Sequence, residues 1–461
     1  MAVIGLDDTD SRTRGMCTTY VAVQVARALE RGTTGTVERL LLIRLNPAVE
    51  FKTRGNAALA IHLEDADNGA AESGSLETLT ETAYEVTRDV LGELAIVDDE
   101  QTNPGFVIAG HDPEETPKAV SKFASDAITS HLTIEDAMAL ADEHGYRHWG
   151  AGNGRGRIGA MAAVGAWTAL EDWTYEYISY RNADRWGTDR EVDLESVFAA
   201  AEQGYPTVWD TVDREEGETV CVPHTPGPIL HGIRGDDREA VKAVANAIES
   251  EPVLERQLFV TNQGTDAHLG EGCEHSDGSL EGQVRPDGTL EGFDHVRDGH
   301  AYRLTGWVSS EPTTRRGGHV FFEFADSKSA ADSSTTLTCA AFEPTKRFRD
   351  RVRALEVGDR LTVCGEVSDG TLKLEKFAVR ALVTTERVTP TCPSCDRRME
   401  SAGRNQGYRC RDCDTSAETK VERPLERDLE IGWYEVPPCA RRHIAKPLIR
   451  GGFDAPTHPE R

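Results

Sequence analysis

Two pairs of cysteines near the C-terminus constrain the fold most strongly. Cys392 and Cys395 form one Cys-x-x-Cys motif, and after fourteen residues Cys410 and Cys413 form another. Four thiolates at this spacing can surround one Zn²⁺ tetrahedrally, which is typical of a closed structural site. The six other cysteines are scattered, as in proteins of a reducing compartment with no disulfide framework. The sequence therefore predicts a zinc ribbon over residues 388–420 that stabilises local structure and does no chemistry.

The length and the charge indicate several domains in a salt-rich environment. A chain of 461 residues is too long for one ordinary core. Its net charge of −28, with 10 lysines against 41 arginines, is similar to that of proteins from a high-salt cytoplasm. Residues 1–300 carry −31 and residues 301–450 carry +4, so any nucleic acid is expected on the last third. With no signal peptide and no apolar run of about 20 residues, we expect a cytoplasmic protein without a membrane partner.

An acidic cluster follows the first predicted strand. The apolar run Val3 to Leu6 ends at Asp7, Asp8 and Asp10, and an amphipathic helix is predicted from Thr18 to Leu29. Ligands of open α/β sheets bind where strands end, and clustered carboxylates suit Mg²⁺ with nucleotide phosphates. The alternative is an ordinary turn with a helix N-cap.

The α/β pattern continues to about residue 189 and includes a glycine-rich run. Gly152–Asn153–Gly154–Arg155–Gly156 leads directly into an alanine-rich helix. Glycines allow the backbone to approach a ligand closely, and a helix N-terminus favours an anion, so this run is a candidate ATP or phosphate site. It is not a Walker A loop, because no Gly-Lys-Ser/Thr follows. A tight helix–strand crossing is the alternative.

Residues 190–290 show a different order of predicted strands and helices, which is typical of a ferredoxin-like α+β domain. Strands alternate there with helices predicted at 194–202 and 238–248. A polar run that includes Asn262, Gln263 and Asp266 follows its last predicted strand, where loops that contact ligands often lie. An ordinary connecting loop is the alternative, and residues 267–298 are predicted to form a linker or long loop.

Residues 300–385 predict an OB-fold β-barrel. Five short strands are expected at 302–308, 319–324, 336–342, 360–367 and 372–383, with a basic helix over 346–355. OB-folds commonly bind oligonucleotides. Four phenylalanines are candidates for stacking on bases, although strand alternation places half of them in the core: Phe321, Phe322, Phe324 and Phe342. Residues 421–461 are expected to form a basic tail, either solvated or in contact with RNA phosphates.

Several motifs together resemble the archaeal tRNA(Ile) 2-agmatinylcytidine synthetase (agmatidine synthetase) family, in its haloarchaeal form. The similarity covers nearly the whole chain in order. Its blocks are Gly5–Ser11, Gly15–Tyr20, Gly152–Gly156, Phe259–Asp266, Glu343–Lys346 and Arg441–Leu448. The resemblance implies a kinase-like α/β domain at 1–189, in which Thr18 is autophosphorylated, followed by the ferredoxin-like domain, the OB-fold and the zinc ribbon.

The resemblance also implies a reaction. The enzyme would join agmatine to C2 of the wobble cytidine in a CAU-anticodon tRNA(Ile), so that AUA is decoded as isoleucine. Because the C2 oxygen leaves poorly, ATP would phosphorylate it before the amine attacks. Asp7, Asp8, Asp10 and Thr18 are the expected catalytic residues, with ATP, Mg²⁺ and structural Zn²⁺ as cofactors.

The binding partners can be assigned candidate residues. Agmatine is a dication, so carboxylates and uncharged acceptors suit it, and Asn262, Gln263 and Asp266 are the candidates. Candidate tRNA contacts are basic residues of the last third: Lys346, Arg347, Arg349, Arg441, Arg442 and Lys446. A non-enzymatic single-strand nucleic-acid-binding protein is the alternative function, and it would leave the acidic cluster without a role.

Overall fold

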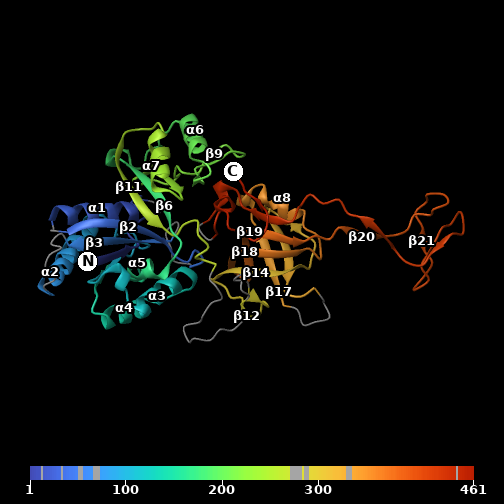
Figure 1. The fold of residues 1–461 in the computed structure, drawn as a ribbon, viewed down its shortest axis with the longest axis horizontal. Helices are drawn as coiled ribbons and strands as arrows, with labels where there is room; N and C mark the ends of the chain where they lie inside the picture. The colour runs from blue at the N-terminus through green and yellow to red at the C-terminus, as the bar shows by residue number, and fades with distance from the viewer. Residues whose placement is uncertain are drawn as a thin grey trace.

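The computed structural model describes residues 1–11, 14–32, 35–49, 56–65, 73–269, 283–284, 290–328, 335–442 and 445–461. Figure 1 shows three parts: a helix-covered sheet that contains the N-terminus, a β-barrel beside it, and a small ribbon on an extended stalk. Within the described ranges, no helix is both long enough and apolar enough to cross a membrane.

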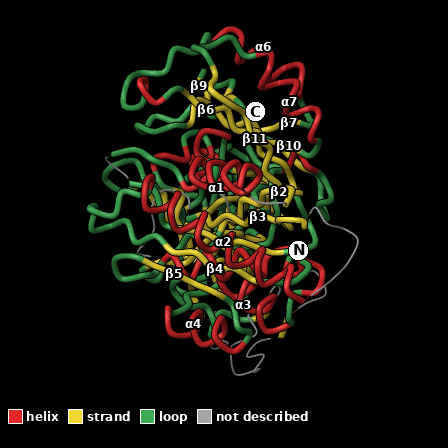
Figure 2. Tube along the Cα trace, turned by 90° about the vertical axis from the view of Figure 1, so that its left-hand side faces the viewer, coloured by secondary structure: helices red, strands yellow, loops and turns green. Residues whose placement is uncertain are grey.

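The first part is built on one nine-stranded sheet with the order β5-β4-β1-β3-β2-β11-β6-β10-β7. All neighbours are antiparallel except β11 and β2, which pair in parallel over two residue pairs. Figure 2 follows this layer from β5 and β4 up to β6 and β7. The strands are β1 (Ala2–Asp7), β2 (Gly35–Arg44), β3 (Ala57–Asp65), β4 (Gly105–Ala109), β5 (Arg147–Gly150), β6 (Thr174–Arg181), β7 (Val208–Trp209), β10 (Ile229–Gly235) and β11 (Val253–Thr261).

Helices cover both faces of this sheet. The side chains of Ile4 and Leu6 pack on one face under α1 (Thr18–Gly32) and α2 (Ser73–Leu94). The other face is covered by α3 (Lys118–Thr129), α4 (Ile134–Glu143) and α5 (Gly156–Ala169). A Cβ at Gly5 would lie 2.0 Å from the carbonyl oxygen of Ala160, so the glycine lets α5 rest directly on β1. The far half carries α6 (Leu194–Gly204) and α7 (Arg238–Ala247).

The sheet continues across the predicted boundary at residue 189. Strand β6 lies before that position, and its partners β10 and β11 lie after it. Strand β6 is not among the strands predicted from the sequence, and the strands after α6 are short: β7, β8 (Val212–Asp213) and β9 (Glu218–Thr219). The kinase-like and ferredoxin-like domains therefore remain predictions, whereas a mixed α/β architecture is confirmed.

The barrel agrees closely with the predicted strands. It closes in the order β14-β16-β17-β19-β18 and back to β14, with α8 (Phe348–Arg353) between β17 and β18. Phe322 and Phe324 point into its core, as alternation requires. The strands are β14 (Ala301–Val308), β16 (Val320–Ala325), β17 (Thr336–Ala341), β18 (Arg360–Ser368) and β19 (Thr371–Ala381), with the short β15 (Thr313–Thr314) paired to β16. The expected five-stranded barrel is confirmed.

The remaining described segments attach to the barrel. The stalk pairs β20 (Thr385–Val388) with β24 (Val421–Pro424), and the ribbon contains β21 (Glu400–Ser401), β22 (Tyr408–Arg409) and β23 (Ser416–Ala417). Beyond the stalk, the chain is structured: β25 (Gly432–Glu435) pairs with β19 and with β26 (Thr457–His458). Most of the predicted linker at 267–298 lies outside the described residues; its short pieces β12 (Gln283–Val284) and β13 (Leu290–Glu291) extend the barrel sheet at β14.

Candidate active site

The acidic cluster lies where β1 ends, as the sequence predicts. Asp8 adopts a left-handed backbone conformation (φ 57°), and its N–H donates to Oδ1 of Asp7 across 2.6 Å. Burial raises the pKa of Asp7 well above its usual value, and the Asp8 carboxylate raises it further. Burial raises the pKa of Asp8 to about 6, although the Arg155 guanidinium opposes the shift. A cation bound beside these two carboxyl groups would stabilise their ionised forms.

The glycine-rich run lies against this cluster. Arg155 Nε donates to Asp8 Oδ2 across 2.7 Å. A Cβ at Gly159 would lie 2.0 Å from Asp7 Oδ2, and one at Gly152 would lie 2.3 Å from Asn103 Oδ1. The tight helix–strand crossing given as the alternative for this run is thus present, and the ATP or phosphate site stays a prediction.

The amides of the run are occupied. Each backbone N–H from residue 153 to residue 158 donates within the protein, for example Asn153 N to Asn103 Oδ1 across 2.9 Å. Arg157 turns back to the carbonyl of Gly154. In this conformation the run therefore has no free backbone N–H between residues 153 and 158 to offer an anion, and Asn153 and Arg155 are its residues that line a cavity.

A large cavity opens beside Asp8. Its volume is about 690 Å³, and we call it the Asp8 cavity. Asp7, Asp8, Asn153 and Arg155 line one side, and residues 130–135 between α3 and α4 line the other. This volume lies within the range of small-molecule sites and can hold a nucleotide.

A second, smaller cavity lies on the other side of the same segment. It measures about 220 Å³ and is lined by Asp10 together with Cys17, Thr18 and Thr19 at the start of α1; we call it the Thr18 cavity. Ala57 lines both cavities. The three aspartates are therefore divided: Asp7 and Asp8 face the large cavity, and Asp10 faces the small one.

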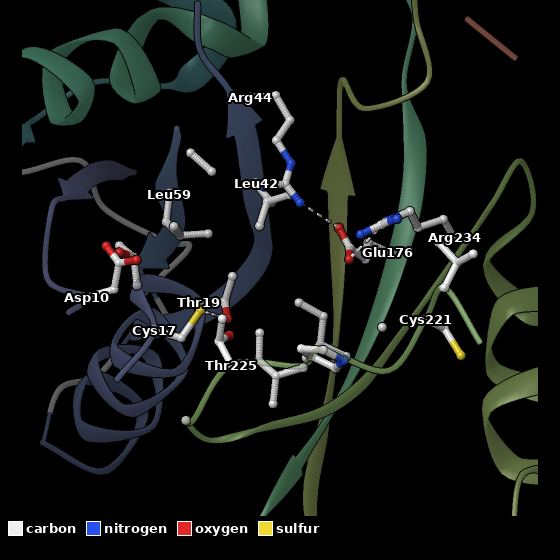
Figure 3. Close-up of a pocket in the computed structure, with 18 of the residues that line it drawn as sticks. Asp10, Cys17, Thr19, Leu42, Arg44, Leu59, Glu176, Cys221, Thr225 and Arg234 are labelled. Carbon is white, nitrogen blue, oxygen red and sulfur yellow. Dashed lines mark hydrogen bonds and ion pairs between the residues drawn. The ribbon is translucent and has the colours of Figure 1, made fainter. Parts of the chain in front are cut away.

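An ion-pair triad forms the far wall of the Thr18 cavity. Figure 3 shows Glu176 of β6 between Arg44 of β2 and Arg234 of β10. The Arg44 pair spans 3.4 Å and the Arg234 pair 3.2 Å. Burial lowers the pKa of Arg44, although the Glu176 carboxylate opposes this shift. Sequence reasoning missed this triad, although the alternating run of β6 (TYEYISYR) is a strand signal.

Two of the three predicted agmatine residues, Asn262 and Gln263, lie behind this wall. Asn262 holds the Arg44 backbone, with Oδ1 accepting from Arg44 N at 2.7 Å and Nδ2 donating to Arg44 O at 3.0 Å. Gln263 Oε1 accepts from Arg44 Nε across 2.9 Å. Asp266 instead faces the barrel, where Lys376 Nζ lies 2.8 Å from it. Although burial opposes it, the Lys376 ammonium holds the pKa of Asp266 below its usual value.

The predicted tRNA-binding side chains make internal contacts. Lys346 and Arg347 pair with carboxylates of the loop between β8 and β9, and Arg349 pairs with Glu343. Arg441 pairs with Asp210 and Glu435, and Arg442 pairs with Glu366 and Glu375. The Lys446 ammonium lies over the ring of Phe453. His443, from the same motif, lies outside the described residues. Their role in binding tRNA therefore stays a prediction.

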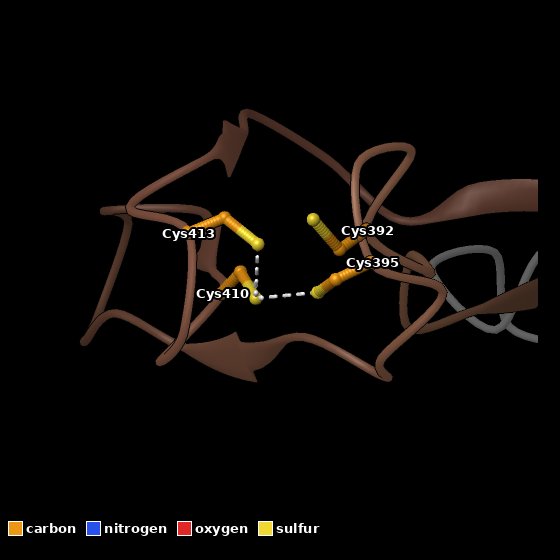
Figure 4. Close-up of side chains that lie close together, drawn as sticks. All are labelled: Cys392, Cys395, Cys410 and Cys413. Carbon is orange, nitrogen blue, oxygen red and sulfur yellow. Dashed lines mark hydrogen bonds between the residues drawn. The ribbon is translucent and has the colours of Figure 1, made fainter.

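The four ribbon cysteines converge as predicted (Figure 4). The Sγ atoms of Cys395 and Cys410 are 3.5 Å apart, and those of Cys410 and Cys413 are 3.9 Å apart. A tetrahedral Zn²⁺ with Zn–S bonds of about 2.3 Å places its sulfurs about 3.8 Å apart. Among the described residues, this is the group whose ligand atoms all lie within 4.8 Å of one another; the three aspartates do not converge to that extent.

The paired cavities, the barrel and the ribbon define a multidomain enzyme that carries nucleic-acid-binding modules. Three family models match the chain: the TiaS TCKD domain at residues 3–153, the TiaS FLD domain at 154–268 and the TiaS C-terminal zinc ribbon domain at 389–429. The 2-agmatinylcytidine synthetase TiaS of Haloquadratum walsbyi, named for its action on an isoleucine tRNA, is 53% identical and covers 100% of both chains. This chain belongs to the TiaS family.

Solved structures of relatives agree with this assignment. A crystal structure of TiaS in complex with its isoleucine tRNA and ATP is 40% identical, with a TM-score of 0.83, and covers 100% of this chain and 99% of its own. A crystal structure of TiaS with the same tRNA, AMPCPP and agmatine is 39% identical, with a TM-score of 0.80 and the same coverage.

Proposed function

We propose that this chain uses ATP to join agmatine to C2 of the wobble cytidine in a CAU-anticodon tRNA(Ile), so that AUA is decoded as isoleucine. Support comes from relatives over the whole length that are named as synthetases of this modification. A related structure that holds an isoleucine tRNA, an ATP analogue and agmatine supports the same substrates. The alternative, a non-enzymatic nucleic-acid-binding protein, would leave residues 3–268 without a role and is not favoured.

One observation carries the proposal at the level of the site: a single segment separates two cavities of unequal size. Asp8 lines the cavity of about 690 Å³, and Thr18 lines the cavity of about 220 Å³. A nucleotide fits the first, and a small group fits the second. Phosphoryl transfer requires a donor and an acceptor held in line on either side of the transferred group, and this arrangement suits it.

The Asp8 cavity would hold the triphosphate of ATP. Mg²⁺ fits beside Asp7 and Asp8, because both are buried neighbours whose pKa values are raised, and two carboxylates plus phosphates are its usual ligands. When bound, Mg²⁺ supplies neutralisation of charge on the phosphates. Arg155 is held by Asp8 at the cavity wall, so its guanidinium can face the phosphate oxygens.

The Thr18 cavity would hold the acceptor groups. Transfer of the γ-phosphoryl group to the C2 oxygen of cytosine releases ADP and makes phosphate the leaving group at C2. The amine of agmatine then attacks C2, the C–O bond breaks with its electron pair on the phosphate, and the nitrogen now bonded to C2 loses a proton. Thr18, whose hydroxyl is predicted to be autophosphorylated, lines this cavity together with Asp10.

The agmatine residues predicted from the sequence can act from behind the cavity. Asp10 offers a carboxylate to a dication in this cavity, whereas the carboxylate of Glu176 is already paired with two arginines. Asn262 and Gln263 fix Arg44, which in turn contacts Glu176. We therefore assign Asn262 and Gln263 to positioning, and Asp266 to the contact between this part and the barrel.

The reaction itself tests the proposal. The protein is incubated in molar KCl with CAU-anticodon tRNA(Ile), ATP, Mg²⁺ and labelled agmatine, because high salt screens repulsion between the acidic surface and RNA. Label is expected in this tRNA and not in a GAU-anticodon control. Thr18→Ala and Asp8→Ala are expected to abolish transfer with tRNA affinity retained, and Asp89→Ala on the exposed surface of α2 serves as the matched control. Absence of label with folded protein would overturn the proposal.

A further inference from the structure

Aromatic side chains gather on the outer surface of the barrel, away from the catalytic cavities. Because Phe322 and Phe324 point inward, Phe321, which directly precedes Phe322 on β16, points outward. Its ring centroid lies 6.0 Å from that of Phe342, which follows β17. His319 completes the group, with its ring centroid 5.3 Å from that of Phe342. We call His319, Phe321 and Phe342 the aromatic platform.

Hydrogen bonds hold the platform in place. The backbone N–H of Glu343 donates to His319 Nδ1 across 2.9 Å, which ties the β15–β16 hairpin to the turn after β17. Arg349 Nη1 donates to the carbonyl of Gly318 across 2.9 Å. Two different parts of the barrel are thus fixed so that their phenylalanines share one surface, and this preorganisation lowers the cost of binding.

The charge beside the platform suits an anion. The Arg315 guanidinium lies over the ring of Phe321, 3.9 Å from its centroid. Arg315 and Arg316 are exposed, and neither forms an ion pair with any residue that the structure describes. The neighbouring carboxylate, Glu343, is paired with Arg349. These two guanidinium groups were not among the residues predicted to bind tRNA, and they differ from those residues, which are engaged in internal contacts.

The position on the barrel also indicates the ligand. Phe321 lies on the second barrel strand, Phe342 ends the third, and Arg315 belongs to the connection between the first and second. This is the face on which five-stranded barrels of this type bind oligonucleotides. Rings stack on bases, and arginines contact phosphates, in sequence-tolerant single-strand binding.

We propose that the aromatic platform is a binding site for an unpaired nucleotide of the RNA substrate, whose base stacks on Phe321 and Phe342 while Arg315 and Arg316 contact its phosphates. The inference rests on the proposed function for the identity of the RNA. Bases inside RNA helices are already stacked, so the ligand comes from a single-stranded part of the tRNA, either its 3′ end or a loop.

Paired substitutions test the site in the full chain. Phe321→Leu removes an outward ring and keeps apolar bulk, and Phe322→Leu makes the same change on the inward side. We expect Phe321→Leu and Phe342→Leu to weaken tRNA binding about 10- to 100-fold, the range that loss of one stacked base gives. Phe322→Leu should leave affinity unchanged. The kcat of agmatine transfer at saturating tRNA should also stay at the wild-type value, because no residue of the aromatic platform lines the Thr18 cavity or the Asp8 cavity.

Three RNAs distinguish the source of the nucleotide: intact tRNA, tRNA without its unpaired 3′ nucleotides, and the isolated anticodon stem-loop. If the 3′ end is the ligand, Phe321→Leu should weaken the binding of intact tRNA only. If a loop is the ligand, the substitution should also weaken the binding of the truncated tRNA. Equal affinity of wild type, Phe321→Leu and Phe342→Leu for intact tRNA would overturn the inference. A wild-type protein that binds tRNA through the platform without transferring agmatine would contradict the proposed function alone.

Discussion

The guanidinium of Arg155 and the carboxylate of Asp8 meet across 2.7 Å although 147 positions separate them in the chain. Arg155 directly precedes α5, and Asp8 directly follows β1, so this pair joins the glycine-rich run to the acidic cluster. Within the proposed function, it also places one positive charge where transferred phosphate would gain negative charge.

Replacement of this arginine should therefore affect chemistry more than folding. We expect Arg155→Ala to lower the kcat of agmatine transfer about 100- to 1,000-fold, which is typical for one lost contact to transition-state charge. Arg157→Ala is the matched control, since Arg157 turns back to the Gly154 carbonyl. Steady-state kinetics with both variants would measure the difference, and equal losses in the two would show that the run acts only structurally.

Gln263 provides a test of the wall of the Thr18 cavity. Its Oε1 accepts from Arg44 Nε, so Gln263→Leu would leave a buried guanidinium N–H without that partner. We expect kcat/KM for agmatine to fall about 10-fold while KM for ATP stays constant, because ATP is placed in the other cavity. Gln263→Glu keeps an acceptor and should restore most of the loss. A rise in KM for ATP in Gln263→Leu would contradict the division between the cavities.

The sequence predicted the features that depend on local residue pattern, and it did not predict contacts between residues that are far apart in the chain. Alternation located the barrel strands and placed half of the four phenylalanines in the core, and the structure shows Phe322 and Phe324 there. The end of a buried strand located Asp7 and Asp8. By contrast, the pairing of Glu176 with Arg44 and Arg234 depends on the order of strands in the sheet, which no local pattern encodes.

The same limit explains the basic residues of the C-terminal segment. Their sequence shows positive charge but not the carboxylates that face it: Asp210, which pairs with Arg441, lies 231 positions away. Composition therefore favoured contact with RNA phosphates, whereas tertiary structure supplies internal partners. An arginine such as Arg315, which has no ion-pair partner among the described residues, can be separated from paired ones only once the fold is known.

The Arg441 ion pairs should be important for stability. Arg441 is buried between Asp210 and Glu435, and its distance to Glu435 Oε1 is 2.9 Å. Arg441→Met would leave two buried carboxylates without their counterion, which costs about 3–5 kcal/mol of the free energy of unfolding. Urea denaturation would measure this loss, and adding Asp210→Asn should recover part of it. The exposed pair Arg423–Glu386 offers the control, because Arg423→Ala should cost less than about 1 kcal/mol.

The ribbon should lose its structure independently of the rest. It is joined to the barrel through the β20–β24 stalk (Figure 1). We expect one zinc per chain by elemental analysis and almost none in Cys410→Ser, while Cys439→Ser retains the metal. Because the main cores do not include the ribbon cysteines, the principal thermal transition of Cys410→Ser should shift by less than about 2 °C. A large shift would show that the ribbon stabilises the whole chain.

Buried histidines predict how stability depends on pH. Burial lowers the pKa of His62 to about 3 and those of His231 and His268 to about 4, against an ordinary value of 6.5. Both ring nitrogens of His62 and of His231 are buried without a hydrogen-bond partner in the described structure. Between pH 6.5 and 4 the unfolded chain therefore binds more protons at these sites than the native protein does.

Stability should accordingly be complete above pH 6.5 and should fall as the pH drops toward 4. Each histidine contributes a loss of about 2 kcal/mol at pH 5. Urea unfolding at pH 7.5 and pH 5, at constant molar KCl, would measure the total. His62→Phe keeps an aromatic ring beside Trp167 and removes the proton site, so it should reduce the loss by about one third, whereas His224→Phe on an exposed loop should not. An unchanged loss in His62→Phe would mean that this ring is not kept neutral by the fold.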